Sequence, residues 1–157
     1  LGYPRSAVLR GVVLASALGL VALPLWSHLS DRIGRRPVCL AGALVSLVVA
    51  FPCFWLIERG PGFMALAIVL GINLGHDMMY GPMAAYLSEL FGAHVRYSGA
   101  SLAYQLASVL AGGLAPFIAT LLLARYGSDA VAAYVVGCCA ITVAAAWLAP
   151  ETHRSTL

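Results

Sequence analysis

The sequence predicts an all-α protein that crosses a membrane five times. Of its 157 residues, 62% are hydrophobic and only 10% are charged, whereas soluble domains carry about 25% charged residues. The apolar residues form long runs, and a helix needs about 20 predominantly apolar residues to cross the hydrocarbon core. These runs lack the period-two alternation of strands, so the backbone hydrogen bonds must be satisfied within helices. The composition excludes a soluble enzyme.

Five apolar runs are long enough to span, and short linkers between them hold nearly every ionisable group. The first run carries Arg10 near its start and Pro24 near its end, and the third is interrupted only by His76 and Asp77. The other three runs have no charge. The expected helices, in a single membrane domain over residues 1–157, cover approximately 7–26, 38–57, 63–87, 98–124 and 130–149.

The net charge of +3 comes from nine arginines without any lysine. They lie between the apolar runs and form no continuous basic stripe, which argues against a nucleic-acid partner. Because five spans put the two termini on opposite faces, the arginines divide five to four between the faces. The larger group contains Arg32, Arg35, Arg36, Arg96 and Arg154. The positive-inside rule then places the 28–37 loop and the C-terminus in the cytoplasm.

The cysteines indicate packing and not metal binding. All four lie inside apolar runs, and none has a histidine or carboxylate at a metal-ligand spacing. Small buried cysteines are common in apolar interiors. We therefore expect no metal and no cofactor. The four residues are Cys39, Cys53, Cys138 and Cys139.

Three stretches resemble known transporter motifs. Residues 27–36, SHLSDRIGRR, resemble the signature loop of the major facilitator superfamily, G-x-x-x-D-R-x-G-R-R, with Ser27 in place of its first glycine. Residues 89–101 resemble the loop between helices 10 and 11 in the metabolite:proton symporter family, which includes shikimate and proline-betaine transporters. Pro150-Glu151-Thr152 resembles the motif after helix 12. On this resemblance the spans correspond to helices 8 to 12, a partial second half, with helix 7 and the first half absent.

The resemblance implies the C-terminal part of a secondary active transporter for proton-coupled uptake of a small organic metabolite by alternating access. Its partners would be the lipid bilayer, the metabolite, the proton and the missing N-terminal half, in the inner membrane of a bacterium. The fragment alone is not expected to transport. A non-transporting membrane scaffold, or a split-transporter subunit that needs a first-half partner, is the alternative. A membrane redox enzyme would need paired histidines or a cysteine pattern, and only His76 lies within a span.

The charged residues around the first linker predict a cytoplasmic gating network. Arginine keeps its charge, so the arginines must stay at the aqueous interface. Gly34 permits a tight turn, and the Asp31 carboxylate can pair with arginine or accept bonds from a helix N-terminus. Solvated loop residues that only set orientation are the alternative, and the resemblance favours the gate. The expected members are Asp31, Arg32, Gly34, Arg35, Arg36, Glu89, Arg96 and Glu151.

One face of the third span predicts a substrate or proton pathway. An aspartate at this depth costs roughly 2.5–3.5 kcal/mol on insertion scales, so Asp77 needs a partner or a water-filled cavity. At 100° per residue, four polar side chains of this span share about 100° of arc. A His–Asp pair that only holds helices together is the alternative. With the fourth span included, the expected pathway residues are Asn73, His76, Asp77, Tyr80, Tyr104 and Gln105.

Overall fold

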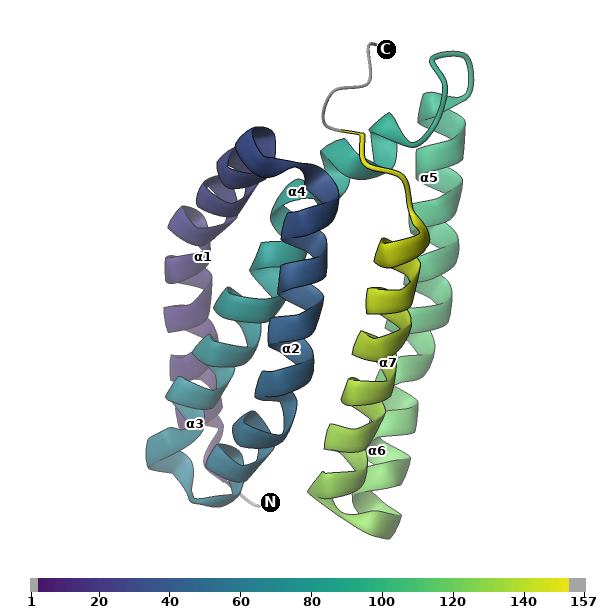
Figure 1. Ribbon diagram of the computed structural model, residues 1–157. Helices are drawn as coiled ribbons and strands as arrows, with labels where there is room; N and C mark the ends of the chain where they lie inside the picture. The colour runs from purple at the N-terminus through teal and green to yellow at the C-terminus, as the bar shows by residue number, and fades with distance from the viewer. Residues whose placement is uncertain (1–2, 153–157) are drawn as a thin grey trace.

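The computed structural model describes residues 3–152, and every regular element in that part of the chain is helical (Figure 1). Five helical spans are long and apolar enough to cross a membrane, as the sequence predicts. Arg154 and the C-terminus, used above to argue orientation, lie outside the described residues. The elements are α1 (Arg5–Ile33), α2 (Arg35–Glu58), α3 (Pro61–Val69), η1 (Leu70–His76), α4 (Asp77–Glu89), α5 (Arg96–Ala107), η2 (Ser108–Gly113), α6 (Leu114–Tyr126) and α7 (Ser128–Leu148).

The expected 28–37 loop is wrong in extent, because nearly all of it is helical. Helix α1 continues to Ile33 and α2 begins at Arg35, so only Gly34 separates them. Gly34 reverses the chain with φ +114°, a conformation that costs glycine little. Pro37 lies in the first turn of α2, where a backbone N–H has no partner within the helix.

The third and fourth spans each contain a π-helical segment, which the sequence did not predict. The third span runs α3–η1–α4 and the fourth runs α5–η2–α6. Near η2, Pro116 cannot donate a hydrogen bond to Gly112, four residues earlier, and its ring crowds that carbonyl, so a wider turn relieves the collision. In η1, the carbonyl of Asn73 accepts a hydrogen bond from the Trp26 indole of α1, 3.4 Å away. Such wide turns free backbone carbonyls for other partners.

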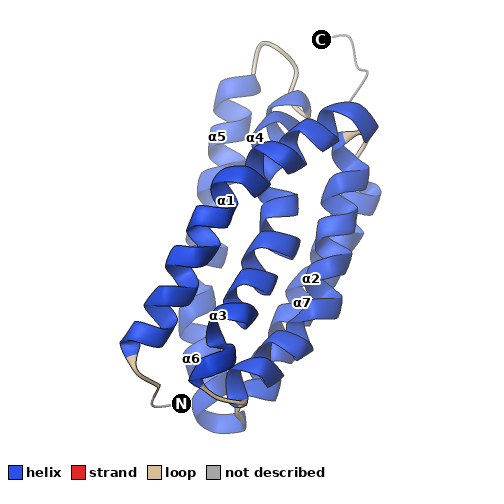
Figure 2. Ribbon diagram, turned by 90° about the vertical axis from the view of Figure 1, so that its left-hand side faces the viewer, coloured by secondary structure: helices blue, strands red, loops and turns tan. Residues whose placement is uncertain are grey.

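The third span lies between α1 and α2, and α7 packs along the other side of α2 (Figures 1 and 2). The fourth span lies beside α7, and none of its residues is buried. The turn between α1 and α2, the loop after α4 and the end of α7 share one end of the molecule, at the top of Figure 1. This arrangement brings three sequence-distant charged segments together.

Small residues let the third span approach both neighbours at backbone distance. A Cβ atom on Gly11 would lie 3.1 Å from the Cα of Ala65, and one on Gly75 would lie 3.1 Å from the Cα of Ser46. Close backbone approach replaces the hydrophobic effect as a source of helix association within a membrane. On α1 the buried contact stripe repeats every four residues and consists of Ala7, Gly11, Ala15 and Gly19.

The substitution Gly75→Ala tests this packing against Gly137→Ala. Alanine favours a helix over glycine by about 1 kcal/mol at either position, but only Gly75 faces a backbone, since nothing lies within 4 Å of the Cβ position at Gly137. We expect Gly75→Ala to lower the free energy of unfolding by about 1–3 kcal/mol and Gly137→Ala to leave it unchanged or higher. Equal effects in detergent-solubilised thermal unfolding would contradict the packing argument.

Candidate functional site

The guanidinium of Arg35 joins three helices at one end of the molecule. Its Nη2 lies 3.2 Å from Oε1 of Glu89 on α4, and its Nη1 forms an ion pair with Asp31 on α1. The same Nη1 donates to the Ser30 hydroxyl at 2.7 Å. The Arg35 side chain is 13% exposed and that of Glu89 is 17% exposed, whereas Asp31 is 54% exposed. The Arg35–Glu89 pair is therefore the more sheltered of the two.

The carboxylate of Glu151 caps the N-terminus of α2. Its Oε1 accepts a hydrogen bond from the backbone N–H of Arg35 at 3.0 Å, and its Oε2 accepts from that of Arg36 at 3.1 Å. Helix N-termini carry unsatisfied N–H groups and partial positive charge, which favour an anion. A Cβ atom on Gly34 would lie 2.6 Å from Oε2 of Glu151. Glycine is thus required here by both its positive φ and the approach of this carboxylate.

The side chain of Arg36 caps the C-terminus of α7. Its Nε donates to the carbonyl of Ala146 at 3.1 Å, and its Nη2 donates to that of Trp147. The guanidinium also lies 5.5 Å from the centroid of the Trp147 ring, a cation–π distance. Since Glu151 follows α7 and Arg36 belongs to α2, the two antiparallel helices cap each other. We call this pair of contacts the reciprocal cap.

Further contacts tie the segment after α7 to α4. The Thr152 hydroxyl donates to Oε2 of Glu89, and the Tyr86 hydroxyl donates to the carbonyl of Pro150 at 2.9 Å. At the far end of the molecule, Ser128 in the first turn of α7 donates to the carboxylate of Glu58 at the end of α2. Helices α2 and α7 are therefore bonded at both ends.

Two expected members of the charged network have no hydrogen bond or ion pair with the other members among the described residues. Arg32 is exposed, because one residue turns a helix by 100° and Asp31 already faces Arg35. Arg96 begins α5, and its Nε is buried without a hydrogen-bond partner among residues 3–152. The structure brings together the other six: Asp31, Gly34, Arg35, Arg36, Glu89 and Glu151.

In the third span, Asn73, Asp77, His76 and Tyr80 form one continuous chain of contacts. Asn73 Nδ2 donates to Oδ2 of Asp77 at 2.8 Å, and Nδ1 of His76 lies 3.2 Å from the other oxygen, Oδ1. The His76 ring stacks on Tyr80 with centroids 5.2 Å apart. Asp77 is only 4% exposed, whereas the His76 side chain is 58% exposed. A buried carboxylate is thus connected to the surface through an imidazole.

Asn73 also bonds to α1 and leaves one atom unsatisfied. Its Nδ2 donates to the carbonyl of Ala15 at 2.9 Å, which uses the second amide hydrogen. Its Oδ1 is buried and has no hydrogen-bond partner among the described residues. An unpaired buried acceptor costs about 1–3 kcal/mol. Gly19 of α1 covers the same place, since a Cβ there would lie 3.3 Å from Oδ2 of Asp77.

Tyr104 of the fourth span meets this face across a cavity of about 250 Å³. Gln105, expected beside it, is exposed and does not line that cavity. The cavity is lined by Tyr80, Met83, Ala84, Leu87 and Tyr104.

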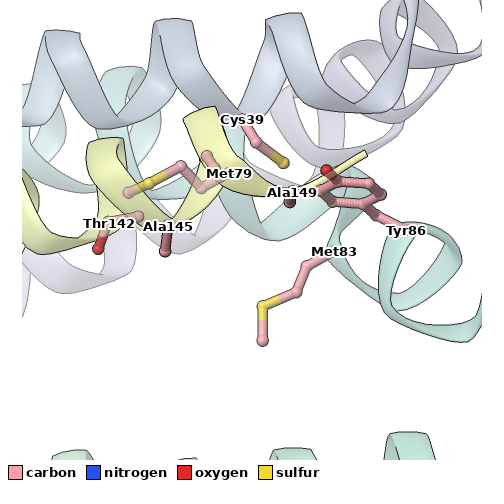
Figure 3. Close-up of a pocket in the computed structure, with 8 residues that line it drawn as sticks. Cys39, Met79, Met83, Tyr86, Thr142, Ala145 and Ala149 are labelled. Carbon is pink, nitrogen blue, oxygen red and sulfur yellow. The ribbon is translucent and has the colours of Figure 1, made fainter. Parts of the chain in front are cut away.

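A second cavity of about 250 Å³ lies between α2, α4 and α7 (Figure 3). Met83 lines both cavities, and the second one reaches Tyr86 near the charged end. Its lining is mainly apolar and comprises Cys39, Met79, Met83, Tyr86, Thr142, Ala145, Ala146 and Ala149.

A family model described as "Sugar (and other) transporter" matches residues 1–157. The chain belongs to the sugar (and other) transporter family. This confirms the resemblance to major facilitator metabolite transporters. The sugar (and other) transporter family and the relatives below are transporters and not enzymes. None of the solved protein structures matches the chain.

Curated relatives cover nearly the whole chain but are much longer. The shikimate transporter of Escherichia coli K12 is 35% identical over 158 residues, which are 99% of this chain and 36% of that protein. An inner membrane metabolite transport protein of the same organism is 36% identical over 159 residues, which are 100% of this chain and 36% of that protein. A citrate-proton symporter of Klebsiella pneumoniae is 38% identical over 120 residues, which are 76% of this chain and 27% of that protein. The chain thus spans about a third of the length of the relatives it matches.

Several contacts in this member of the sugar (and other) transporter family were not foreseen from its sequence. The small-residue stripe of α1 could have been read from its four-residue spacing, as for other membrane helices. The bonds from Arg36 to α7, and from Ser128 to Glu58, carry no such signal because their partners are distant in sequence. They become visible only once α2 and α7 are placed side by side.

Gly34→Ala, compared with Gly60→Ala, tests the cap on α2. Both glycines have positive φ, at +114° and +126°, but only Gly34 faces Glu151. Backbone strain of about 1–3 kcal/mol is expected at both positions, with about 1 kcal/mol more at Gly34 from the displaced cap. The measurement is the unfolding free energy in detergent, and the excess should vanish when Glu151 is also changed to alanine. An excess that persists without Glu151 would contradict this role.

Proposed function

We propose that the chain is the C-terminal part of a secondary active transporter that couples uptake of a small organic metabolite to protons by alternating access. The observation that supports this most directly is Asp77, a carboxylate buried in a membrane span and bonded to Asn73 and His76. Ionisable groups at such depth are costly and characteristically line ion or substrate pathways. One relative is named a citrate-proton symporter, which favours a proton as the coupling ion.

The proposed substrate and proton pathway follows the exposed side of the third span. His76 and Tyr80 present a stacked imidazole and phenol there, and Tyr104 lines the same cavity as Tyr80. Gln105 belongs to this proposal because it is exposed on α5, the helix that carries Tyr104. A neutral imidazole has one nitrogen that accepts and one that donates, which suits a group that passes on a coupling proton.

The proposed gate is the cluster around Arg35. It joins α1, α2, α4 and the segment after α7 at one end of the molecule. Partly exposed ion pairs contribute about 0–1 kcal/mol each. Contacts of that size can hold one state and still be exchanged for water when the helix ends separate.

The proposed partner is the N-terminal half of the transporter. The fourth span buries none of its residues within the described part of the chain, so its faces are available to other helices or to lipid. We place the protein in the inner membrane of a bacterium, with residues 28–37 and the C-terminus in the cytoplasm. The grouping of Arg32, Arg35 and Arg36 supports this orientation.

Asp77→Asn tests proton coupling in proteoliposomes that contain the whole transporter as the cell makes it. Shikimate and citrate, the compounds named for two relatives, serve as probes. Accumulation driven by a proton gradient should fall to the level of protein-free liposomes, because an amide cannot take up the proton, while exchange without a gradient should persist. Thr120→Val, which removes a hydroxyl bonded only within its own helix, should leave accumulation unchanged. Gradient-driven accumulation by Asp77→Asn would refute the coupling role, and its absence in the unaltered protein would favour a scaffold.

Glu89→Gln tests the gate, with Cys39 as a native reporter. Cys39 lines the cavity of Figure 3, one helical turn beyond Arg35. Weakening the Arg35–Glu89 pair should speed its reaction with a thiol reagent up to about fivefold, equivalent to about 1 kcal/mol. Peptide mass spectrometry separates Cys39 from the other cysteines. Arg125→Gln, at the end of α6, is the matched control, and an unchanged Cys39 rate in Glu89→Gln would argue against the gate.

A further inference from the structure

The two oxygens of the Asp77 carboxylate have different surroundings. Oδ2 accepts a hydrogen bond from Asn73 at 2.8 Å and lies beneath Gly19 of α1. Oδ1 lies 3.2 Å from Nδ1 of His76, whose side chain is 58% exposed. Since Asp77 itself is 4% exposed, the imidazole connects it to the surface of the described chain. Only Oδ1 therefore faces a group that can carry a proton.

The side-chain amide of Asn73 is held in one orientation. Both hydrogens of Nδ2 are used, one by the carbonyl of Ala15 at 2.9 Å and the other by Oδ2 of Asp77. A flipped amide would turn its oxygen toward both of these acceptors. Because the amide gives both of its donors to one side, its Oδ1 is buried on the other side, where no described residue bonds to it.

We propose that Asn73 is a positioning residue that keeps Oδ2 of Asp77 unprotonated and directs the proton to Oδ1 through His76. This inference rests on the proposed function, in which Asp77 takes up the coupling proton. An N–H donor held against Oδ2 stabilises the charged carboxylate and opposes an O–H at that atom. The proton is thereby assigned to the oxygen that faces the exposed imidazole.

The transfer balances without any other reactant. His76 begins neutral, with its proton on Nδ1 and shared with Oδ1 of Asp77. A proton from water binds Nε2, the Nδ1–H bond breaks, and an O–H bond forms at Oδ1. The imidazole is neutral again, now with its proton on Nε2, and the carboxylate has become a neutral carboxylic acid. Release follows the same bonds in reverse.

Among the described side chains, the partners of the Asp77 carboxylate are Asn73 and His76, and no second imidazole or carboxylate contacts it. Helix α1 packs Ala15 and Gly19 against this place, and α2 packs Ser46 against the adjacent Gly75. On its own span, Tyr80 stacks on His76, and Tyr104 of α5 lines the same cavity as Tyr80. His76 is thus the one described neighbour suited to relay the proton.

The test is infrared difference spectroscopy of the whole transporter, reconstituted in liposomes and titrated with acid. The band of a protonated carboxylic acid belongs to Asp77 if Asp77→Asn removes it. Asn73→Ala should move the midpoint of this band to higher pH by about one unit, a tenfold change in proton affinity, since the charged form loses a donor. Asn73→Ser, which restores one donor, should reverse part of the shift, and Thr120→Val should cause none.

Each outcome separates this inference from the proposed function. If the Asp77 band keeps the midpoint of the unaltered protein in both Asn73 variants, the positioning role is overturned and Asp77 is still the proton site. Absence of any Asp77-dependent band in the unaltered protein would overturn the proton site and the positioning role with it. If Asn73→Ala does not fold, Asn73→Ser alone decides the positioning role. A single hydroxyl cannot donate to both the Ala15 carbonyl and Oδ2 of Asp77, so the midpoint of the band should still rise, by less than in Asn73→Ala.

Discussion

Lipid offers no hydrogen bonds, so each polar group within the hydrocarbon must find its partner inside the protein. This constraint explains where the described chain places its polar contacts. The charged side chains gather at a helix end, where Arg35 and Arg36 reach carboxylates, carbonyls and water. Within the spans, Asp77 is satisfied by its own helix, and Asn73 extends that bonding to α1. At Gly11 and Gly75 the backbone of the third span also comes close to α1 and α2.

Two sequence-distant helices, α2 and α7, are bonded to each other at their termini. Helices α2 and α7 are joined by the reciprocal cap of Glu151 and Arg36 at one end and by Glu58 and Ser128 at the other. The contacts of Glu151 and Arg36 satisfy backbone groups at helix ends, whereas the Ser128–Glu58 bond joins two side chains. Helices α2 and α7 are therefore bonded to each other at both ends.

The sequence predicted the five spans because apolar runs of this length have one stable solution in a membrane. It also predicted that Asn73, His76, Asp77 and Tyr80 would lie together on the third span, where the structure joins them by contacts. It did not predict that Asn73 and Asp77 would be buried while His76 and Tyr80 are exposed. It could not predict which helix end Arg36 would cap, or that Arg96 would lie apart from Glu89, because those outcomes depend on how helices are placed in space. The sequence predicted a loop over residues 28–37 because charged residues are concentrated there, whereas only Gly34 separates α1 from α2.

The π-helical segment η1 acts as an inserted residue within an otherwise regular helix. One added residue rotates the rest of the helix by about 100°. Segment η1 therefore sets the rotation of α4 relative to α3. Helix α3 packs on the small-residue stripe of α1, whereas α4 carries Tyr80 at the cavity and Glu89 at the charged end. A related chain without the extra residue of η1 would have a third span of similar hydropathy, but the polar face of that span would point in another direction. The direction of the polar face therefore depends on the register of the span and not on its composition.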